Sequence, residues 1–158
     1  MEACTVGKVL TPAEVLALLP QQEPFRFVDE ILEVDDDHIV ATYRFSPELD
    51  FYRGHFPGNP VTPGVILVEA MAQVSVVAQG VYLFAKEMDD VSLLSDMVMV
   101  FTDAQVDFSG IVKPGERVTI LGKKKFYRRR KLCADVEMCL DDGTVVCSGR
   151  LSGMGVDQ

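Results

Sequence analysis

Alternation of apolar and polar residues predicts six β-strands along the chain. In the second of these strands, Ile39, Ala41 and Tyr43 would lie on one face, with the residues between them on the other. The acidic run at 35–37 directly precedes this strand and favours a hairpin with the strand before it. The six predicted strands span residues 27–34, 38–45, 97–108, 117–127, 132–140 and 144–152.

A short helix is predicted near the start of the chain, over residues 11–19. Thr11 is a suitable N-cap, Pro12 fits the first helical position, and Glu14 completes a capping box with Thr11. The apolar residues that follow end at Pro20, which cannot continue a helix.

A much longer apolar segment predicts a central helix over about 64–86. At ~1.5 Å per residue this helix is long enough to cross a bilayer. Glu69, Gln73 and Gln79 interrupt the apolar run, and a carboxylate at membrane depth is costly. We therefore expect a helix buried inside the protein, and no membrane span.

The order of these elements predicts an α+β fold with one domain over residues 1–158. A length of 158 residues matches the usual size of a single domain, and no linker or repeat divides the chain. Because one long helix interrupts a series of strands, repeated βαβ units are excluded. A sheet of about six strands would have to curl around the apolar helix to bury it.

Composition and charge exclude several classes of function. The net charge of −9 argues against nucleic acid as a partner, since phosphate binding needs a positive field. The four cysteines (Cys4, Cys133, Cys139 and Cys147) form no C-x-x-C pair and only two histidines are present, so we expect reduced structural thiols and no metal site. The first ten residues lack the pattern of a secretion signal, which favours a cytoplasmic location.

Three groups with complementary chemistry fall within residues 54–73. His55 lies in a loop rich in proline and glycine, where few backbone states are available. Gly64 places a backbone N–H near the positive end of the long helix dipole, and Glu69 lies on the otherwise apolar surface of that helix. A base, an amide donor and a buried acid are the groups needed for proton abstraction next to a carbonyl.

Each of these residues also has a purely structural interpretation. A lone histidine is more often structural or solvated than catalytic, and we expect His38, which follows three aspartates, to be solvated. Glu69 could be a polar anchor whose partner is Gln73, four residues later on the same helix. The functional interpretation is favoured because the three groups occur together in one ordered string.

The same string resembles the signature of a known enzyme family. Residues His55-Phe56-Pro57-Gly58-Asn59-Pro60-Val61-Thr62-Pro63-Gly64-Val65, followed by Glu69-Ala70-Met71-Ala72-Gln73, are similar to the central motif of the FabZ-type 3-hydroxyacyl-acyl-carrier-protein dehydratases. The resemblance extends to Leu19-Pro20, Pro24-Phe25, Val28-Asp29, Phe108, residues 112–116 and the basic run from Lys123. It implies a hotdog fold, in which a curved antiparallel sheet wraps around one long helix.

The resemblance also implies an activity and residue roles. These enzymes dehydrate 3-hydroxyacyl thioesters of acyl carrier protein to trans-2-enoyl thioesters in fatty acid biosynthesis or a related acyl pathway, without a cofactor. On this pattern His55 is the base and Glu69 the acid, and glutamate rather than aspartate here favours dehydration without isomerisation. The residues implied to contact the substrate are Gly64, Phe56, Pro63, Val65 and Gln73.

The resemblance further implies a homodimer whose active sites are shared. The histidine comes from one chain and the acid from the other, and dimers often assemble into hexamers as trimers of dimers. This chain departs from the family at Gln21-Gln22, where a His-Arg pair is common, and at Asp107, Ser109 and Gly110, where basic residues are common. These departures concern subunit contacts, carrier docking and substrate choice, and leave the catalytic string intact.

A basic run contrasts with the acidic remainder of the chain. It holds seven of the fifteen lysine and arginine residues and no acid. Such a run indicates either a solvated face or a docking surface for an acidic partner. An acyl carrier protein, which is acidic and carries a phosphopantetheine arm, fits the second interpretation. The predicted docking residues are Lys123, Lys124, Lys125, Arg128, Arg129, Arg130 and Lys131.

Two other functions stay open on the sequence alone. A hotdog thioesterase would share the fold and hydrolyse the thioester, and fold does not separate the two reactions. A non-catalytic acyl-binding subunit of a synthase complex would bind acyl chains without turnover. The loop histidine fourteen residues before the helix glutamate favours elimination over hydrolysis, and only an assay of turnover would separate the enzyme from the binding subunit.

Overall fold

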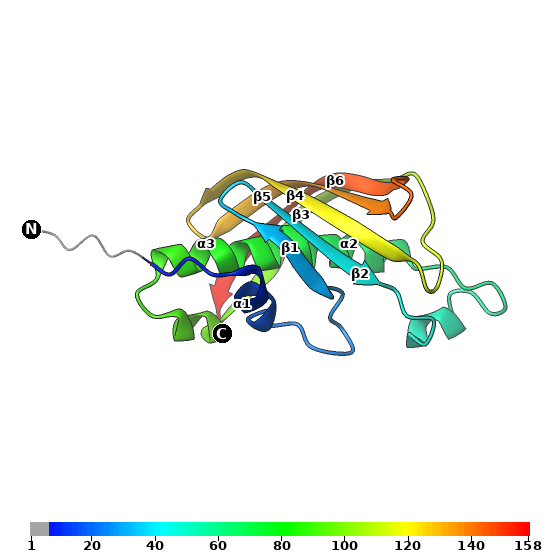
Figure 1. Ribbon diagram of the computed structural model, residues 1–158, viewed down its shortest axis with the longest axis horizontal. Helices are drawn as coiled ribbons and strands as arrows, with labels where there is room; N and C mark the ends of the chain where they lie inside the picture. Colours follow the sequence, from blue (N-terminus) through cyan, green and yellow to red (C-terminus); the bar gives the residue numbers. More distant parts are fainter. Residues whose placement is uncertain (1–6) are drawn as a thin grey trace, which may run out of the picture.

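A six-stranded antiparallel sheet curls around one long helix in the computed structural model, which describes residues 7–158 (Figure 1). The strand order is β1-β2-β4-β5-β6-β3, which leaves β1 and β3 at the two edges. The strands are β1 (Glu30–Val34), β2 (His38–Arg44), β3 (Met97–Phe108), β4 (Arg117–Arg128), β5 (Lys131–Leu140) and β6 (Val145–Asp157). This arrangement confirms the predicted α+β hotdog fold.

The long helix runs without a break from Gly64 to Glu87, over 24 residues. It consists of α2 (Gly64–Ala72), the π-helical segment η2 (Gln73–Ala78) and α3 (Gln79–Glu87). Its length and apolarity would suffice to cross a membrane, but 72% of its most apolar window is buried inside the protein. The apolar surface is therefore used to form the core, as expected for a helix enclosed by protein.

Two glycines allow the sheet to approach the middle of this helix closely. A Cβ on Gly122 of β4 would lie 2.8 Å from the Cβ of Ser75, and one on Gly153 of β6 would lie 2.5 Å from a methyl group of Val76. Both distances are too short for a real Cβ, so a larger residue would push the strand away from the helix. The sheet thus packs backbone-close on η2.

The inward face of β2 follows the predicted alternation. Ile39, Ala41, Tyr43 and Phe45 are all buried, and Tyr43 packs edge-on between Phe27 and Phe45. Their burial removes apolar area from water on the side of the sheet that faces the helix. The hairpin predicted at 35–37 joins β1 to β2.

Some element boundaries differ from the prediction. Helix α1 spans Pro12–Ala17 rather than 11–19, although its capping box with Thr11 is present. Strand β1 begins three residues late because the N–H of Phe27 donates to the side chain of Gln73 (2.8 Å) instead of joining the ladder. Strand β6 continues past residue 152 because it pairs with β3 as far as Asp157.

The structure adds two short 3₁₀ helices that the sequence pattern does not predict, η1 (Asp50–Arg53) and η3 (Val91–Asp96). Cys133, Cys139 and Cys147 are free thiols, in agreement with the expected reduced state. Cys4 lies outside the described residues.

Candidate active site

His55 lies in the loop between η1 and the long helix and is held by three hydrogen bonds. Its N–H donates to the carbonyl of Phe51 (3.0 Å), and its carbonyl accepts from the N–H of Val61 (3.0 Å). Its ring Nδ1 lies 2.9 Å from the carbonyl oxygen of Val61. Because a carbonyl only accepts, Nδ1 carries the hydrogen and Nε2 keeps a free lone pair. The histidine is therefore oriented as a base.

The loop that carries His55 has buried contacts on one side and an exposed aromatic residue on the other. The hydroxyl of Tyr52 lies 2.6 Å from that of Thr62, both buried, and the N–H of Thr62 donates to the carbonyl of Val112 (2.9 Å). Phe56 stacks on the His55 ring at a centroid distance of 4.1 Å, yet is 51% exposed. Buried contacts thus fix the loop from one side, while its aromatic tip faces outward.

Gly64 is the first residue of the long helix and follows Pro63. No side chain caps this helix end among the described residues. The first helical N–H groups that have an acceptor are those of Ile66 (2.9 Å) and Leu67 (3.2 Å), both bonded to the carbonyl of Pro63. The N–H of Gly64 stays available at the positive end of the helix dipole.

Two exposed apolar side chains surround this helix end. A Cβ on Gly64 would lie 3.1 Å from the ring of Phe108, which is itself 53% exposed, and Val65 is 76% exposed. Large apolar groups exposed side by side are typical of an interaction surface.

Glu69 lies one and a half turns into the helix and is half-buried. Its Oε1 accepts a hydrogen bond from Nε2 of Gln73 (3.0 Å). Burial raises the pKa of the Glu69 carboxyl, and the hydrogen bond from Gln73 opposes that rise only in part. The predicted contact between residues four apart is present, and the carboxyl is also shifted toward its neutral form.

Gln73 is fully buried and connects the helix to the segment that covers it. Besides Glu69, its Nε2 donates to the carbonyl of Phe25 (2.9 Å), and its Oε1 accepts from the N–H of Phe27 (2.8 Å). These three bonds use both amide hydrogens and the carbonyl oxygen of the side chain. One glutamine therefore holds Glu69 and residues 25–27 in fixed relation.

Glu69 lines a small cavity between the helix, the segment before β1 and the edge strand β3. The lining residues are Gln21, Glu69, Ala72, Val76, Val77, Met99, Val100 and Phe101. Of the predicted site residues, only Glu69 belongs to this lining, and His55, Phe56, Pro63, Gly64 and Val65 do not. Within one chain, the structure therefore separates the cavity of the acid from the loop of the base.

The basic run forms the hairpin between β4 and β5, at the other end of the long helix (Figure 1). Near this hairpin, the hydroxyl of Tyr127 donates to Glu87 (2.6 Å) and its ring packs against Phe84. A helix of 24 residues is about 36 Å long, so the structure does not bring the hairpin to Gly64 or His55 of the same chain.

Four of the seven basic side chains in this run are paired with aspartates. The pairs are Lys124–Asp37 (3.8 Å), Lys125–Asp135 (3.6 Å), Arg130–Asp157 (3.0 Å) and Lys131–Asp103 (3.9 Å). Within residues 7–158, Lys123, Arg128 and Arg129 have no such partner. Only part of the predicted docking surface is therefore available as free positive charge.

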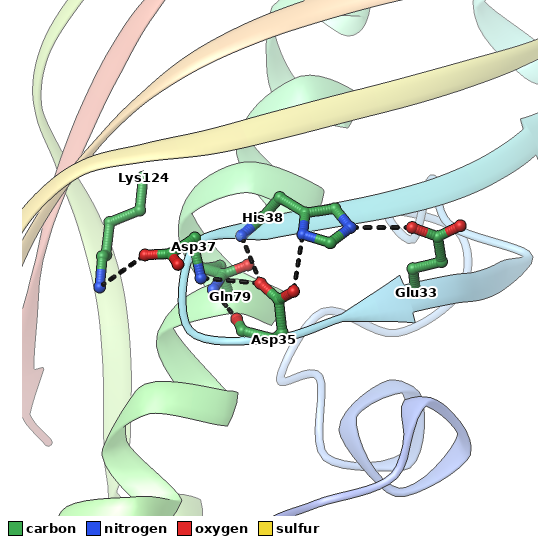
Figure 2. A network of polar contacts seen from close by, with 6 residues as sticks. All are labelled: Glu33, Asp35, Asp37, His38, Gln79 and Lys124. Atoms are coloured by element: carbon green, nitrogen blue, oxygen red, sulfur yellow. Dashed lines mark hydrogen bonds and ion pairs between the residues drawn. The ribbon is translucent and has the colours of Figure 1, made fainter.

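The other histidine, His38, was expected to be solvated, but its ring contacts two carboxylates. Figure 2 shows its ring between two carboxylates, with Nε2 at 2.8 Å from Glu33 and Nδ1 at 2.9 Å from Asp35. The hydrogen bond to Glu33 is the main cause that raises the pKa of His38. The backbone carbonyl of Asp35 also accepts a hydrogen bond from Gln79 (2.5 Å), which ties this hairpin to the long helix. The run of aspartates before His38 was the signal for these contacts.

The described residues contain no group of three or more histidine, cysteine, aspartate or glutamate side chains arranged to hold a metal ion. A larger groove lies on the outer face of the sheet and includes Lys123, but its lining holds none of the predicted catalytic or substrate-binding residues.

Comparisons with known proteins place these residues in context. A family described as the FabA-like domain matches residues 19–149. A 3-hydroxyacyl-[acyl-carrier-protein] dehydratase FabZ of Streptococcus pyogenes is 37% identical over 140 residues, which cover 88% of this chain and 94% of that protein.

Two solved structures resemble the fold at low sequence identity. The dehydratase heterocomplex ApeI:P from Xenorhabdus doucetiae matches with a TM-score of 0.73 at 19% identity, over 94% of this chain and 93% of that one. A thioesterase from Pseudomonas aeruginosa matches with a TM-score of 0.67 at 16% identity, over 98% of this chain and 99% of that one. At these identities the likeness concerns the fold alone, which dehydratases and thioesterases share.

Proposed function

Because the chain belongs to the FabA-like family, as a FabZ-type 3-hydroxyacyl-[acyl-carrier-protein] dehydratase, we propose that it removes water from 3-hydroxyacyl thioesters to give trans-2-enoyl thioesters in fatty acid biosynthesis or a related acyl pathway. The observation that carries this proposal is that the chain holds both a histidine whose Nε2 lone pair is free and a half-buried glutamate whose pKa is raised. Elimination needs one group that accepts a proton and one that donates it.

His55 acts as the base in this reaction. Its Nε2 takes the proton from C2 of the substrate, while the hydrogen bond from Nδ1 to the Val61 carbonyl keeps the ring in the required tautomer. The electrons of the C2–H bond become the second bond between C2 and C3.

Glu69 acts as the acid on the neighbouring carbon. It delivers its proton to the C3 hydroxyl, the C3–O bond breaks, and both electrons of that bond leave with water. A carboxyl must be protonated to do this, and burial favours the protonated form. We assign Gln73 to hold Glu69 in position, since its polar atoms are already used by protein groups.

Gly64 stabilises the charge that develops between these two steps. As the C2 proton leaves, negative charge grows on the thioester oxygen. An N–H at the start of a long helix is a suitable donor for it. Phe56, Pro63 and Val65 are proposed to flank the thioester arm, as their place around Gly64 and His55 suggests.

The complete site requires a second copy of the chain. The Glu69 cavity lacks His55 in a single protomer, so the base has to come from a neighbour. Strand β3 has a free edge twelve residues long that exposes Val100 and Phe101, and such an edge is open to pairing. A homodimer that covers β3, Phe108 and Val65 would bring His55 of one chain to Glu69 of the other, and three such dimers would form a hexamer.

An acyl carrier protein is the proposed partner that delivers the substrate. The unpaired Lys123, Arg128 and Arg129 offer local positive charge to an acidic protein surface. The net charge of −9 on the whole chain would repel nucleic acid. A cytoplasmic location fits this partnership and the burial of the apolar helix in the core.

A direct assay separates this proposal from its alternatives. Purified protein is mixed with a 3-hydroxyacyl thioester, and enoyl absorbance and free thiol are followed together. Dehydration gives enoyl absorbance without thiol. Release of thiol alone would instead identify a thioesterase, and acyl binding with no turnover in either direction would identify a non-catalytic acyl-binding subunit.

A further inference from the structure

One residue that lines the Glu69 cavity, Gln21, carries a buried polar atom without a partner. Among the described residues, three buried side-chain polar atoms lack a hydrogen bond: Oε1 of Gln21, Nε of Arg26 and Oε1 of Gln79. Gln21 differs from the other two because it also lines the cavity that holds Glu69. A buried acceptor without a donor costs free energy, so its retention beside the acid points to a donor that arrives with the ligand.

The segment that carries Gln21 is fixed to the same anchor as Glu69. Gln73 bonds to Glu69 on one side and to the backbone of Phe25 and Phe27 on the other. The side chain of the adjacent Gln22 donates to the carbonyl of Leu19 (3.0 Å) and does not belong to the cavity lining. One buried glutamine therefore links Glu69 to the segment that follows Gln21 in the chain.

The remaining lining defines the kind of ligand that fits. Apart from Gln21 and Glu69, every lining residue is apolar: Ala72, Val76, Val77, Met99, Val100 and Phe101. An acyl chain with a single hydroxyl matches such a surface. A hydroxyl can accept a proton on its oxygen and donate its own hydrogen, and the cavity offers one group for each purpose.

Building on the proposed function, we propose that Oε1 of Gln21 accepts a hydrogen bond from the C3 hydroxyl of the substrate while neutral Glu69 donates to the oxygen of that hydroxyl. As the proton of Glu69 is transferred and the C3–O bond breaks, the departing water becomes a stronger donor, and its bond to Gln21 strengthens. Gln21 gains and loses no proton. It selects acyl chains that carry the hydroxyl over saturated chains that lack it.

The substitution Gln21→Met tests this assignment, because methionine keeps a similar volume and removes the acceptor. Gln22→Met is the matched control at the adjacent exposed position. The probes are the pantetheine thioesters of 3-hydroxyhexanoic acid and hexanoic acid. For Gln21→Met we expect kcat/KM and affinity for the hydroxylated probe to fall about tenfold, with inhibition by the saturated probe unchanged. The control variant should match the wild type on both probes.

Thermal unfolding supplies a second measurement that a structural role would move in the opposite direction. Removing a buried acceptor that has no donor in the free protein should leave the melting temperature of Gln21→Met unchanged or raise it. A glutamine that mainly supports the fold would lower the melting temperature when replaced. Lower stability together with equal loss of affinity for both probes would overturn the proposal.

The binding arm keeps this test separate from the proposed function. If the wild type turned over no 3-hydroxyacyl thioester, the proposed function would fail, yet the preference for the hydroxylated over the saturated probe could still be measured. If the wild type were active and Gln21→Met retained both its turnover and its preference for the hydroxylated probe, only the role of Gln21 would fail.

Discussion

The two histidines of this chain differ in the partners of their ring nitrogens. In the β1–β2 hairpin, both ring nitrogens of His38 contact carboxylates, and its pKa is raised (Figure 2). In the loop before the long helix, His55 uses one nitrogen on a carbonyl and keeps the other free. A base needs a nitrogen with an unshared lone pair. Both ring nitrogens of His38 are engaged by carboxylates, so His38 is not suited to act as a base. Nε2 of His55 has no such partner in the described part of the chain, so His55 is suited to that role.

The same difference applies to the polar groups around each histidine. Near His38, Lys86 pairs with Asp36 and Lys124 with Asp37, so charges are mostly matched. Near the proposed site, Gln21 Oε1 and the N–H at the start of the helix have no partner among residues 7–158. Gln79 Oε1, beside the His38 hairpin, also lacks a partner, but unlike Gln21 it does not line the cavity that holds Glu69. Unmet hydrogen-bonding capacity is costly for folding, and beside a cavity it marks where a ligand can supply the missing partner.

The largest effect is expected when the free proton-transfer groups are removed. His55→Ala and Glu69→Gln should each lower kcat for dehydration by roughly 10²- to 10⁴-fold, the usual cost of losing one positioned acid or base. Circular dichroism and melting temperature should stay close to those of the wild type. His38→Ala is the matched control for the imidazole and should retain full turnover. Near-normal activity of either site variant would remove the role assignments.

A smaller but double effect is expected from Gln73→Leu, which breaks the link between the site and the covering segment. The N–H of Phe27 and the carbonyl of Phe25 lose their partner, so unfolding should become easier by about 2–4 kcal/mol in urea titrations. The hydrogen bond from Gln73 lowers the pKa of Glu69, so its loss should raise that pKa further. The alkaline limb of the pH–rate profile, which reports loss of the acid's proton, should move to higher pH.

Gln79→Leu is the matched control for this variant, since Gln79 is a buried glutamine on the same helix and donates to the carbonyl of Asp35. It should lower stability and leave the pH–rate profile in place. Equal shifts of the profile in both variants would show that Gln73 acts on Glu69 only through general loosening of the fold.

The sequence predicted the elements that depend on local pattern and missed what depends on distant contacts. The capping box at Thr11, the alternation in β2 and the apolar helix follow from residues close together in the chain, and all three are present. The late start of β1 depends instead on a contact between Phe27 and Gln73, which are 46 residues apart. No local pattern reports such a contact.

The candidate site shows the same limit. The string from His55 to Gln73 predicted which residues act as the base and the acid. The resemblance of that string to a known family implied that the two come from different chains. The lining of the Glu69 cavity could not be predicted, because it depends on how β3 and the segment before β1 fold over the helix. Gln21 was noticed only as a departure from the family pattern, and its unpaired oxygen became visible only once burial was known.

A moderate effect is expected from the basic hairpin, where paired and unpaired charges can be compared directly. Replacing the unpaired Arg128 and Arg129 with alanine should lower kcat/KM for carrier-bound substrate about tenfold and leave a pantetheine thioester unaffected. The loss should shrink at high salt, since the attraction is screened. Arg150→Ala, which removes a charge already paired with Asp135, is the control and should change neither activity. Equal loss on carrier-bound and free thioesters would contradict a docking role.

The smallest effect is expected at His38, and its pH dependence has a defined sign. Glu33 and Asp35 raise the pKa of His38 above its ordinary value of 6.5, so the folded protein holds this proton more tightly than the unfolded chain. The resulting stabilisation is complete below about pH 6.5 and is lost as the pH rises through the folded pKa. Because the side chain is partly exposed, we expect less than about 1 kcal/mol.

His38→Gln measures this contribution, since glutamine can replace a hydrogen bond but not the charge. The difference in unfolding free energy between wild type and variant should be largest near pH 5.5 and vanish toward pH 9, and 1 M salt should reduce it. Dehydration activity at pH 8 should be unchanged. A stability difference that stays constant with pH would mean that the ion pairs of His38 contribute nothing. A loss of turnover comparable to that of His55→Ala would show that a histidine with carboxylates on both ring nitrogens can still take part in catalysis.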